Sequence, residues 1–184
     1  IQSPLNNIAS SCQVCHRESK EQLLADVYSR QDKILENRDK LEEMLVFAHV
    51  EAKKAWDLGA TEDQMKDILK SIRHAQWRWD FAAASHGASF HAPVETARII
   101  SSGMVIIQEG RLKLARLLAS LGHNEMVPYP DISTKAKAQA FIGLDMETYE
   151  KDKAVFLQTI VPEWLKVAAE REKTYEVKDL FTGK

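Results

Sequence analysis

The stretch LADVYSRQDKILENRDKLEEMLVFAHVEAKKAWDLG, residues 24–59, decides the fold of this chain. Along it, mostly apolar side chains recur at alternating steps of three and four, which is the heptad spacing of a helix that packs lengthwise. The positions of this seam are Leu24, Val27, Gln31, Ile34, Arg38, Leu41, Leu45, Ala48, Ala52 and Ala55. Gly59 suits the left-handed conformation that ends many helices. The pattern predicts one helix of about 40 residues, about 60 Å long.

Such a helix is long for a chain of 184 residues. A chain of this size cannot wrap a globular core around the whole rod, so we expect part of the helix to pack on another chain or on protein missing from this sequence. We also expect a dimer or higher oligomer. A net charge of −2 argues against a nucleic-acid-binding protein, which usually carries a basic patch. No apolar run approaches the roughly 20 residues that span a membrane.

Cap and turn residues divide the rest of the chain into further helices. Thr61 and Gln64 have the spacing of a capping box, and Pro93 suits the first turn of a helix. No segment shows the period-2 alternation of a strand, so the predicted class is all-α, a long-helix bundle. The predicted helices cover residues 61–87, 94–121, 133–142 and 146–175, with a kink or break at Pro162.

Residues 11–20, SCQVCHRESK, contain the only two cysteines, Cys12 and Cys15, followed directly by His16. Three chemistries use this kind of spacing: a redox disulfide, a metal site and covalent haem attachment. A redox C-x-x-C pair belongs at a helix N-terminus in a βαβ unit, and no strand is predicted here. A structural zinc site commonly needs a second such pair, which the chain lacks.

Haem attachment is the chemistry that the motif favours. In C-x-x-C-H, the two thiols add to the vinyl groups of the porphyrin and the histidine becomes an axial ligand of the iron. We therefore predict Cys12 and Cys15 as the thioether residues of haem c and His16 as the proximal ligand. Residues 1–18 are predicted as a haem-attachment loop and residues 19–184 as one helical haem-packing and dimerisation domain. Because the motif has no domain before it to complete a pocket, we expect a piece of a longer chain.

A second group of histidines lies in RHAQWRWDFAAASHGASFHAP, residues 73–93. His86 and His91 flank a turn of small residues that includes Gly87. Small residues let a flat macrocycle approach the backbone, and a histidine there can supply a second axial ligand. The simpler interpretation is that the aromatic side chains form core and that the histidines bond nearby carbonyls. Spacing alone does not decide between the two, nor which haem His91 would serve.

Four segments together resemble a known family. They are CQVCHRES (12–19), AHVEAKKAWDLGATEDQMKDILKSIRHAQWRWDFAAASHGASFHAP (48–93), VPYPDIS (127–133) and IVPEW (160–164). Together they resemble the C-terminal part of the pentahaem cytochrome c nitrite reductases, which form ammonium. The resemblance extends from about residue 11 to about residue 175, and residues 74–93 are its most specific part.

The resemblance implies a multihaem, periplasmic oxidoreductase that reduces nitrite to ammonium with six electrons. It implies a homodimer joined through the long helices, an N-terminal haem-bearing part of the same enzyme, and an electron-donor cytochrome or quinol dehydrogenase. It also implies calcium, with ligands outside this chain. By its place in the FHAP segment, His91 would be the distal ligand of a haem attached elsewhere, so that His16 and His91 would both bind haem iron.

Departures from the family limit what this chain is expected to do. It has no C-x-x-C-K motif, and the family's catalytic residues lie before the matched segment, so no catalytic residue is predicted here. The expected function is to contribute one haem site, a distal ligand and dimer-forming helices to an enzyme, without activity alone. Two alternatives stay open: a mono-haem c-type electron-transfer protein and a cofactor-free helical interaction module.

Overall fold

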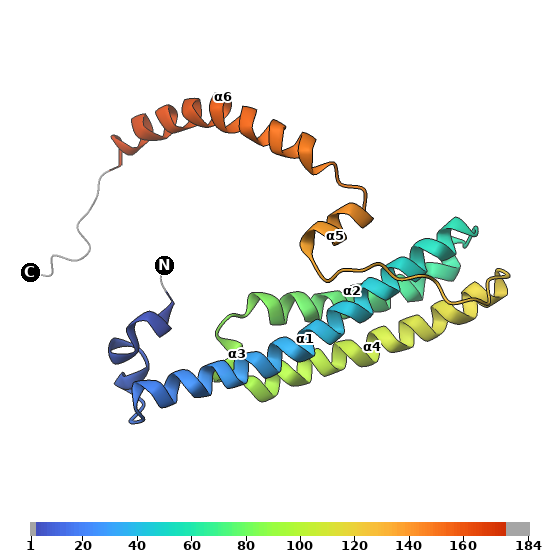
Figure 1. Cartoon of the computed structure of the whole chain (residues 1–184), viewed down its shortest axis with the longest axis horizontal. Coiled ribbons are helices and arrows are strands. Elements are labelled where there is room, and N and C mark those ends of the chain that lie inside the picture. The colour runs from blue at the N-terminus through green and yellow to red at the C-terminus, as the bar shows by residue number, and fades with distance from the viewer. Residues whose placement is uncertain (1–2, 176–184) are drawn as a thin grey trace, which may run out of the picture. The chain divides into compact units, whose positions relative to one another are not determined.

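The computed structural model describes residues 3–175, and every regular element in that range is helical. This confirms the predicted all-α class (Figure 1). The chain forms two compact units, residues 1–129 and residues 130–184. The helical domain predicted over residues 19–184 extends across both units. No helix in the described range is long and apolar enough to cross a membrane.

The first unit contains two short 3₁₀ helices and four α-helices. They are η1 (Pro4–Ser10), η2 (Cys12–Val14), α1 (Lys20–Asp57), α2 (Glu62–Ala84), α3 (Ala88–His91) and α4 (Pro93–Ser120). The second unit contains α5 (Lys135–Phe141) and α6 (Met146–Glu172).

The long helix predicted from the seam is α1, with 38 residues. Ser19 caps its first turn, because the Ser19 hydroxyl accepts a hydrogen bond from the backbone N–H of Gln22 at 3.2 Å. At its other end, Gly59 has φ +87°, a left-handed conformation that glycine adopts without strain. Thr61 then starts α2 with the predicted capping box, in which the Thr61 N–H donates to Gln64 Oε1 at 2.8 Å.

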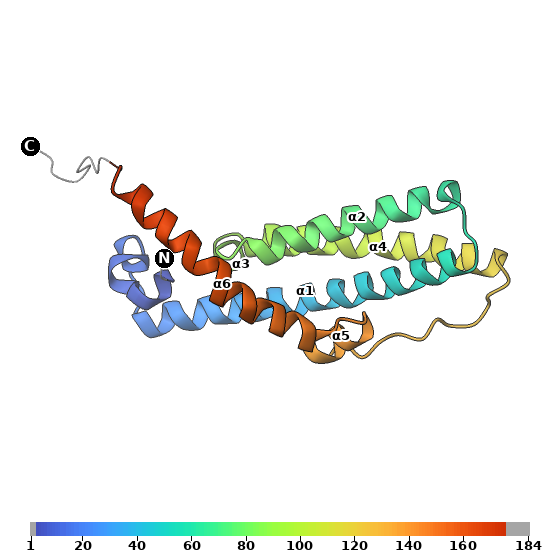
Figure 2. The ribbon, with the colours of Figure 1, turned by 90° about the horizontal axis from the view of Figure 1, so that it is seen from above.

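The three long helices of the first unit form a bundle in which α4 packs along both α1 and α2 (Figures 1 and 2). The turn at Gly59 sends α2 back along α1, and the short α3 reverses the chain again into α4. The seam of α1 is buried in this bundle: Leu41, Ala48 and Ala55 are fully inaccessible. The expectation that this seam packs on another chain is therefore wrong for its central and C-terminal part. The reason is that α4, at 28 residues, covers most of the length of α1 within the same chain.

Two glycines of α4 allow this close packing. A Cβ at Gly103 would lie 2.8 Å from Cδ2 of Leu41 on α1, and a Cβ at Gly110 would lie 2.9 Å from Cβ of Ser71 on α2. Both distances are shorter than van der Waals contact, so an added methyl group would require the flexible end of Leu41 to shift at residue 103 and the Cβ of Ser71 to shift at residue 110. The two glycines are seven positions apart, which places them on the same face of α4.

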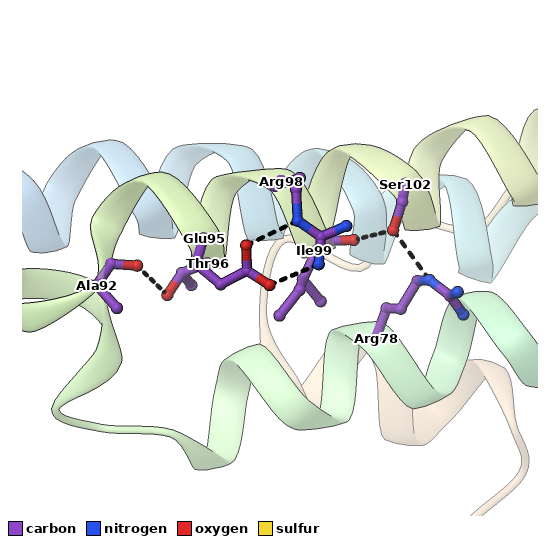
Figure 3. Close-up of polar contacts among 7 residues, drawn as sticks. All are labelled: Arg78, Ala92, Glu95, Thr96, Arg98, Ile99 and Ser102. Atoms are coloured by element: carbon purple, nitrogen blue, oxygen red, sulfur yellow. Dashed lines mark hydrogen bonds and ion pairs between the residues drawn. The ribbon is translucent and has the colours of Figure 1, made fainter.

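Polar contacts add specific links between the helices. Arg78 of α2 donates from Nε to the hydroxyl of Ser102 on α4 at 2.9 Å (Figure 3). At the other end of the bundle, Glu51 of α1 accepts hydrogen bonds from Arg111 of α4 and from the phenol of Tyr129. The Glu51 side chain is only 10% exposed and that of Arg111 26% exposed. The hydrogen bond to Glu51 raises the pKa of Arg111, and burial raises the pKa of Tyr129.

Four local predictions differ from the structure. Most of the first fifteen residues form 3₁₀ turns rather than a loop, with Ser3 capping η1 and Pro4 at its start. Residues 88–91, expected as loop, form the single turn α3. Thr134, not Ser133, caps α5. Of the kink or break predicted at Pro162, the break does not occur, because α6 continues through this residue.

In the second unit, α6 has no buried residue over its 27 residues. Large apolar side chains on it are exposed, including Leu157, Ile160, Trp164 and Leu165. The steps of three, four and one between these residues place them on one broad face of the helix. The stability of α6 therefore owes little to packing within the described part of its own unit.

We predict that Gly110→Ala destabilises the first unit more than Gly103→Ala. The new methyl group at residue 110 meets Cβ of Ser71, which cannot move without its backbone, whereas the methyl at 103 meets the flexible end of Leu41. Overpacking costs about 1–3 kcal/mol, and replacing a helical glycine by alanine returns about 1 kcal/mol. Urea denaturation should show a net loss of about 1–2 kcal/mol for Gly110→Ala and little change for Gly103→Ala. Equal losses for both variants would contradict this.

We predict that Arg111→Met destabilises the protein by about 2–4 kcal/mol, because it leaves the buried Glu51 carboxylate without its cation. Lys53→Met, which removes an exposed partner of Asp57, is the matched control and should change the unfolding free energy little.

The raised pKa of Tyr129 also predicts that stability falls as the pH rises above about 10, since the tyrosine ionises first in the unfolded chain. Tyr129→Phe should reduce this loss of stability at high pH. If the unfolding free energy of the variant fell with pH in parallel with that of the parent, the prediction would be contradicted.

Candidate haem-attachment site

The segment that carries the cysteines is held together by Ser11. The Ser11 hydroxyl lies within hydrogen-bond distance of the carbonyl oxygens of Pro4 (2.8 Å) and Asn7 (2.6 Å). These contacts fold η1 back on the residue that precedes Cys12. Ile8 is only 2% exposed, and η1 packs on α1. The segment is therefore a small folded element beside the start of α1, anchored by one apolar side chain.

Cys12, Cys15 and His16 lie on one tight turn. The backbone N–H groups of Cys15 and His16 both donate to the carbonyl oxygen of Cys12, at 3.1 and 2.9 Å. Both cysteines are free thiols. Cys12 is half-buried, with Sγ 3.7 Å from the Ser11 hydroxyl, whereas Cys15 is exposed. The spacing that the sequence predicted as an attachment motif is thus gathered into a single turn at the surface.

The imidazole of His16 is 53% exposed, and its Nδ1 lies 3.7 Å from Oε2 of Glu18. This distance is too long for a hydrogen bond, but it places a carboxylate on the Nδ1 side of the ring. Histidines that bind metals commonly direct one ring nitrogen to a carboxylate and the other to the metal. Sequence reasoning missed Glu18, whose position two residues after the histidine was the available signal.

These residues fit a covalently bound haem. The turn carries two free thiols at the C-x-x-C spacing, which provide the attachment groups. The adjacent accessible imidazole provides an axial ligand, and the apolar Val14, which is 72% exposed, provides an apolar contact. Zinc fits less well, because the described residues contain no group of three or more His, Cys, Asp or Glu side chains placed to hold a metal ion. The prediction of calcium, with ligands outside this chain, has no support here.

His91 lies at the end of α3 and its side chain is exposed. Its ring meets the ring of Phe90 edge to face, with centroids 4.6 Å apart. Arg30 of α1 donates from Nη1 to the carbonyl oxygen of Phe90 at 3.0 Å, which ties α3 to α1. Because Arg30 lies ten residues into α1, this tie is about 15 Å along the helix from its first residue, Lys20.

The other histidines show less specific surroundings. His74 and His86 are exposed, on α2 and in the turn that follows it. His123 lies three residues after the end of α4, and its backbone N–H donates to the carbonyl oxygen of Leu118. It lines a cavity of about 280 Å³ together with Glu51 and Tyr129. The cavity borders the ion pair between α1 and α4, and Nε2 of His123 is buried there without a hydrogen-bond partner among the described residues.

A model of the cytochrome c552 family matches residues 1–174. The chain belongs to the cytochrome c552 family. Membership implies that it binds haem c. This agrees with the predicted cofactor.

Curated relatives carry the same family name. The chain is 58% identical to cytochrome c-552 of Parabacteroides distasonis over 94% of its length, and 58% identical to that of Bacteroides thetaiotaomicron over 91%. It is 54% identical to cytochrome c-552 of Porphyromonas gingivalis over 91%. The matched region is 35%, 34% and 34% of these relatives, so the chain spans about a third of their length.

These findings correct the family named from the resemblance. The family model and the curated relatives name cytochrome c552, so the assignment to the pentahaem nitrite reductases, with its ammonium-forming function, is wrong on this comparison. The segments behind that assignment hold a haem-attachment motif and histidines among aromatic residues, which are features of haem binding. None of them contains a predicted catalytic residue, so they carried no information about a reaction.

We predict that Cys15 reacts faster than Cys12 with a thiol-alkylating reagent in the haem-free chain. The Cys15 side chain is exposed, whereas Cys12 is half-buried beside Ser11. Peptide mapping by mass spectrometry during a time course would show which thiol is labelled first. Ser11→Ala should narrow the difference, because the hydroxyl no longer ties the Cys12 turn to η1. Faster labelling of Cys12 in the parent chain would contradict the geometry.

Proposed function

We propose that this chain transfers electrons through a haem c attached to Cys12 and Cys15, with His16 as an axial ligand of the iron. The observation that carries this proposal is the turn that gathers two free thiols and an accessible imidazole at the surface. Membership of the cytochrome c552 family supports it. The bound iron supplies one-electron reduction and oxidation.

The protein groups have separate roles in this proposal. The two cysteines hold the cofactor covalently, so it cannot dissociate when its charge changes. His16 positions the iron, and Glu18 favours the imidazole tautomer that leaves Nε2 for the metal. Ser11 and Ile8 keep the turn against the start of α1, so the attachment point does not move freely relative to the bundle.

His91 is a further axial ligand in this proposal. Its exposed imidazole, presented on a small-residue turn beside Phe90, supports the assignment. The haem it serves is either the one attached at Cys12 and Cys15 or one attached outside this chain. The matched region is only about a third of the relatives, which leaves room in them for further attachment sites.

Four expectations remain as proposals about the protein's setting. We propose a periplasmic location, supported by membership of a c-type cytochrome family, and an electron-donor cytochrome or quinol dehydrogenase as partner. We also propose self-association as a homodimer. The exposed Val105 and Leu112 on α4, one heptad apart, support this, because they extend an apolar line outside the bundle. Participation in an oxidoreductase stays a prediction.

The test of haem attachment is to express the chain in bacteria with the covalent haem-attachment machinery and to measure its intact mass and pyridine haemochrome spectrum. The parent chain should carry one haem, and Cys12→Ala and Cys15→Ala should each lose one thioether bond. Arg17→Ala, beside the motif, is the control and should retain full attachment. A reversible one-electron reduction of the product would support electron transfer. A parent mass equal to the bare 20.9 kDa polypeptide would contradict the proposal.

A further inference from the structure

The turn that presents His91 cannot hold its conformation alone. α3 has four residues, and the backbone-to-backbone hydrogen bonds that close it are local: His91 N–H donates to Gly87 O at 3.1 Å, and Ala92 N–H donates to Ala88 O at 2.9 Å. A single helical turn is unstable in water, because nucleation fixes several backbone dihedrals for one hydrogen bond. The direction in which His91 points must therefore be set by contacts from outside α3.

Thr96, in the first turn of α4, supplies such a contact. Its side chain is almost fully buried, at 2% exposure. The Thr96 hydroxyl lies 2.9 Å from the carbonyl oxygen of Ala92 and 3.2 Å from that of Ala88 (Figure 3 draws the contact with Ala92). One hydroxyl thus reaches both ends of the α3 turn and joins them to α4.

Thr96 makes one contact more than a helical threonine ordinarily makes. Threonine in a helix often bonds the carbonyl four residues earlier, which accounts for the contact with Ala92. The contact with Ala88, eight residues earlier, exists only because α3 folds back toward the first turn of α4. Arg30 holds the same turn from α1, through the carbonyl of Phe90, but its side chain is exposed to solvent, whereas Thr96 is buried.

We propose that Thr96 is a positioning residue for His91: its hydroxyl clamps α3 against α4 and so fixes the direction in which His91 offers its imidazole to haem iron. The inference rests on the proposed role of His91 as an axial ligand. A ligand must be held within about 0.5 Å of its productive position. The His91 ring makes no hydrogen bond in the described residues, so its backbone is what holds it.

The experiment compares three variants in the haem-loaded protein: Thr96→Val, which keeps the shape and removes the hydroxyl, Thr96→Ser, which keeps the hydroxyl, and His91→Ala. The probe is carbon monoxide, which binds ferrous haem only when an axial ligand leaves. Thr96→Val should bind it about fivefold faster, as expected for the loss of one buried hydrogen bond, with an increased high-spin component in the visible spectrum. Thr96→Ser should match the parent, and His91→Ala should bind fastest.

A second readout separates positioning from general stability. Amide exchange of Ala92 in the haem-free chain should be faster in Thr96→Val than in Thr96→Ser, while the core of α4 exchanges at the parent rate. If Thr96→Val lowers the melting temperature but leaves carbon monoxide binding unchanged while His91→Ala alters it, the positioning role is overturned and the ligand assignment stands. If His91→Ala changes nothing, His91 is not a ligand of the haem attached at Cys12 and Cys15, and the positioning role proposed for Thr96 at that haem fails with it.

Discussion

The close approach of α4 to both α1 and α2 is the constraint on which the rest of the first unit depends. Gly103 and Gly110 remove the side chains that would keep these helices apart, and Leu41 fills the space at the first of them. Once α4 lies in this groove, Ile107 and Leu114 are fully buried, and the apolar seam of α1 is covered from within the chain. The contact also fixes where the two ends of α4 lie, and each end makes polar contacts with other parts of the first unit.

At the C-terminal half of α4, the packing brings Arg111 to Glu51 and Tyr129, an arrangement that costs stability unless every partner is in place. At its N-terminal end, it places Thr96 under the turn that carries His91. The bundle is thus more than a support for exposed groups. The same helix that supplies the core also sets the orientation of a candidate ligand.

Much of the fold could be predicted from short-range signals. The heptad seam, the Thr61 capping box, Pro93 and the left-handed Gly59 all act through local geometry, and the structure confirms them. The end of the second helix was predicted at residue 87, whereas α2 ends at Ala84. The partner of the seam could not be predicted, because apolar spacing says that a face is buried but not by what. The turn α3 was missed for a related reason. Its helical form depends on Thr96, a contact from outside its own four residues.

The candidate site likewise contains features that the sequence could predict and features that it could not. The motif of Cys12, Cys15 and His16 is readable because haem chemistry fixes the spacing. The family assignment went further than those residues allowed, since attachment motifs record that a haem is bound and not what it does. Ser11 and Glu18 were not foreseen, because their roles arise from how a 3₁₀ turn folds back on itself.

The position of the attachment turn has a consequence for how the protein is made. Its supporting contacts are local: Ser11 bonds residues within the same segment, and η1 packs on α1, the next element in sequence. Such short-range contacts form quickly and need little of the chain, whereas the bundle must wait for α4. As the polypeptide emerges from its N-terminal side, the two thiols can be presented in their native turn while the core is still incomplete. Cofactor loading and bundle assembly are therefore separable steps, and the first need not wait for the second.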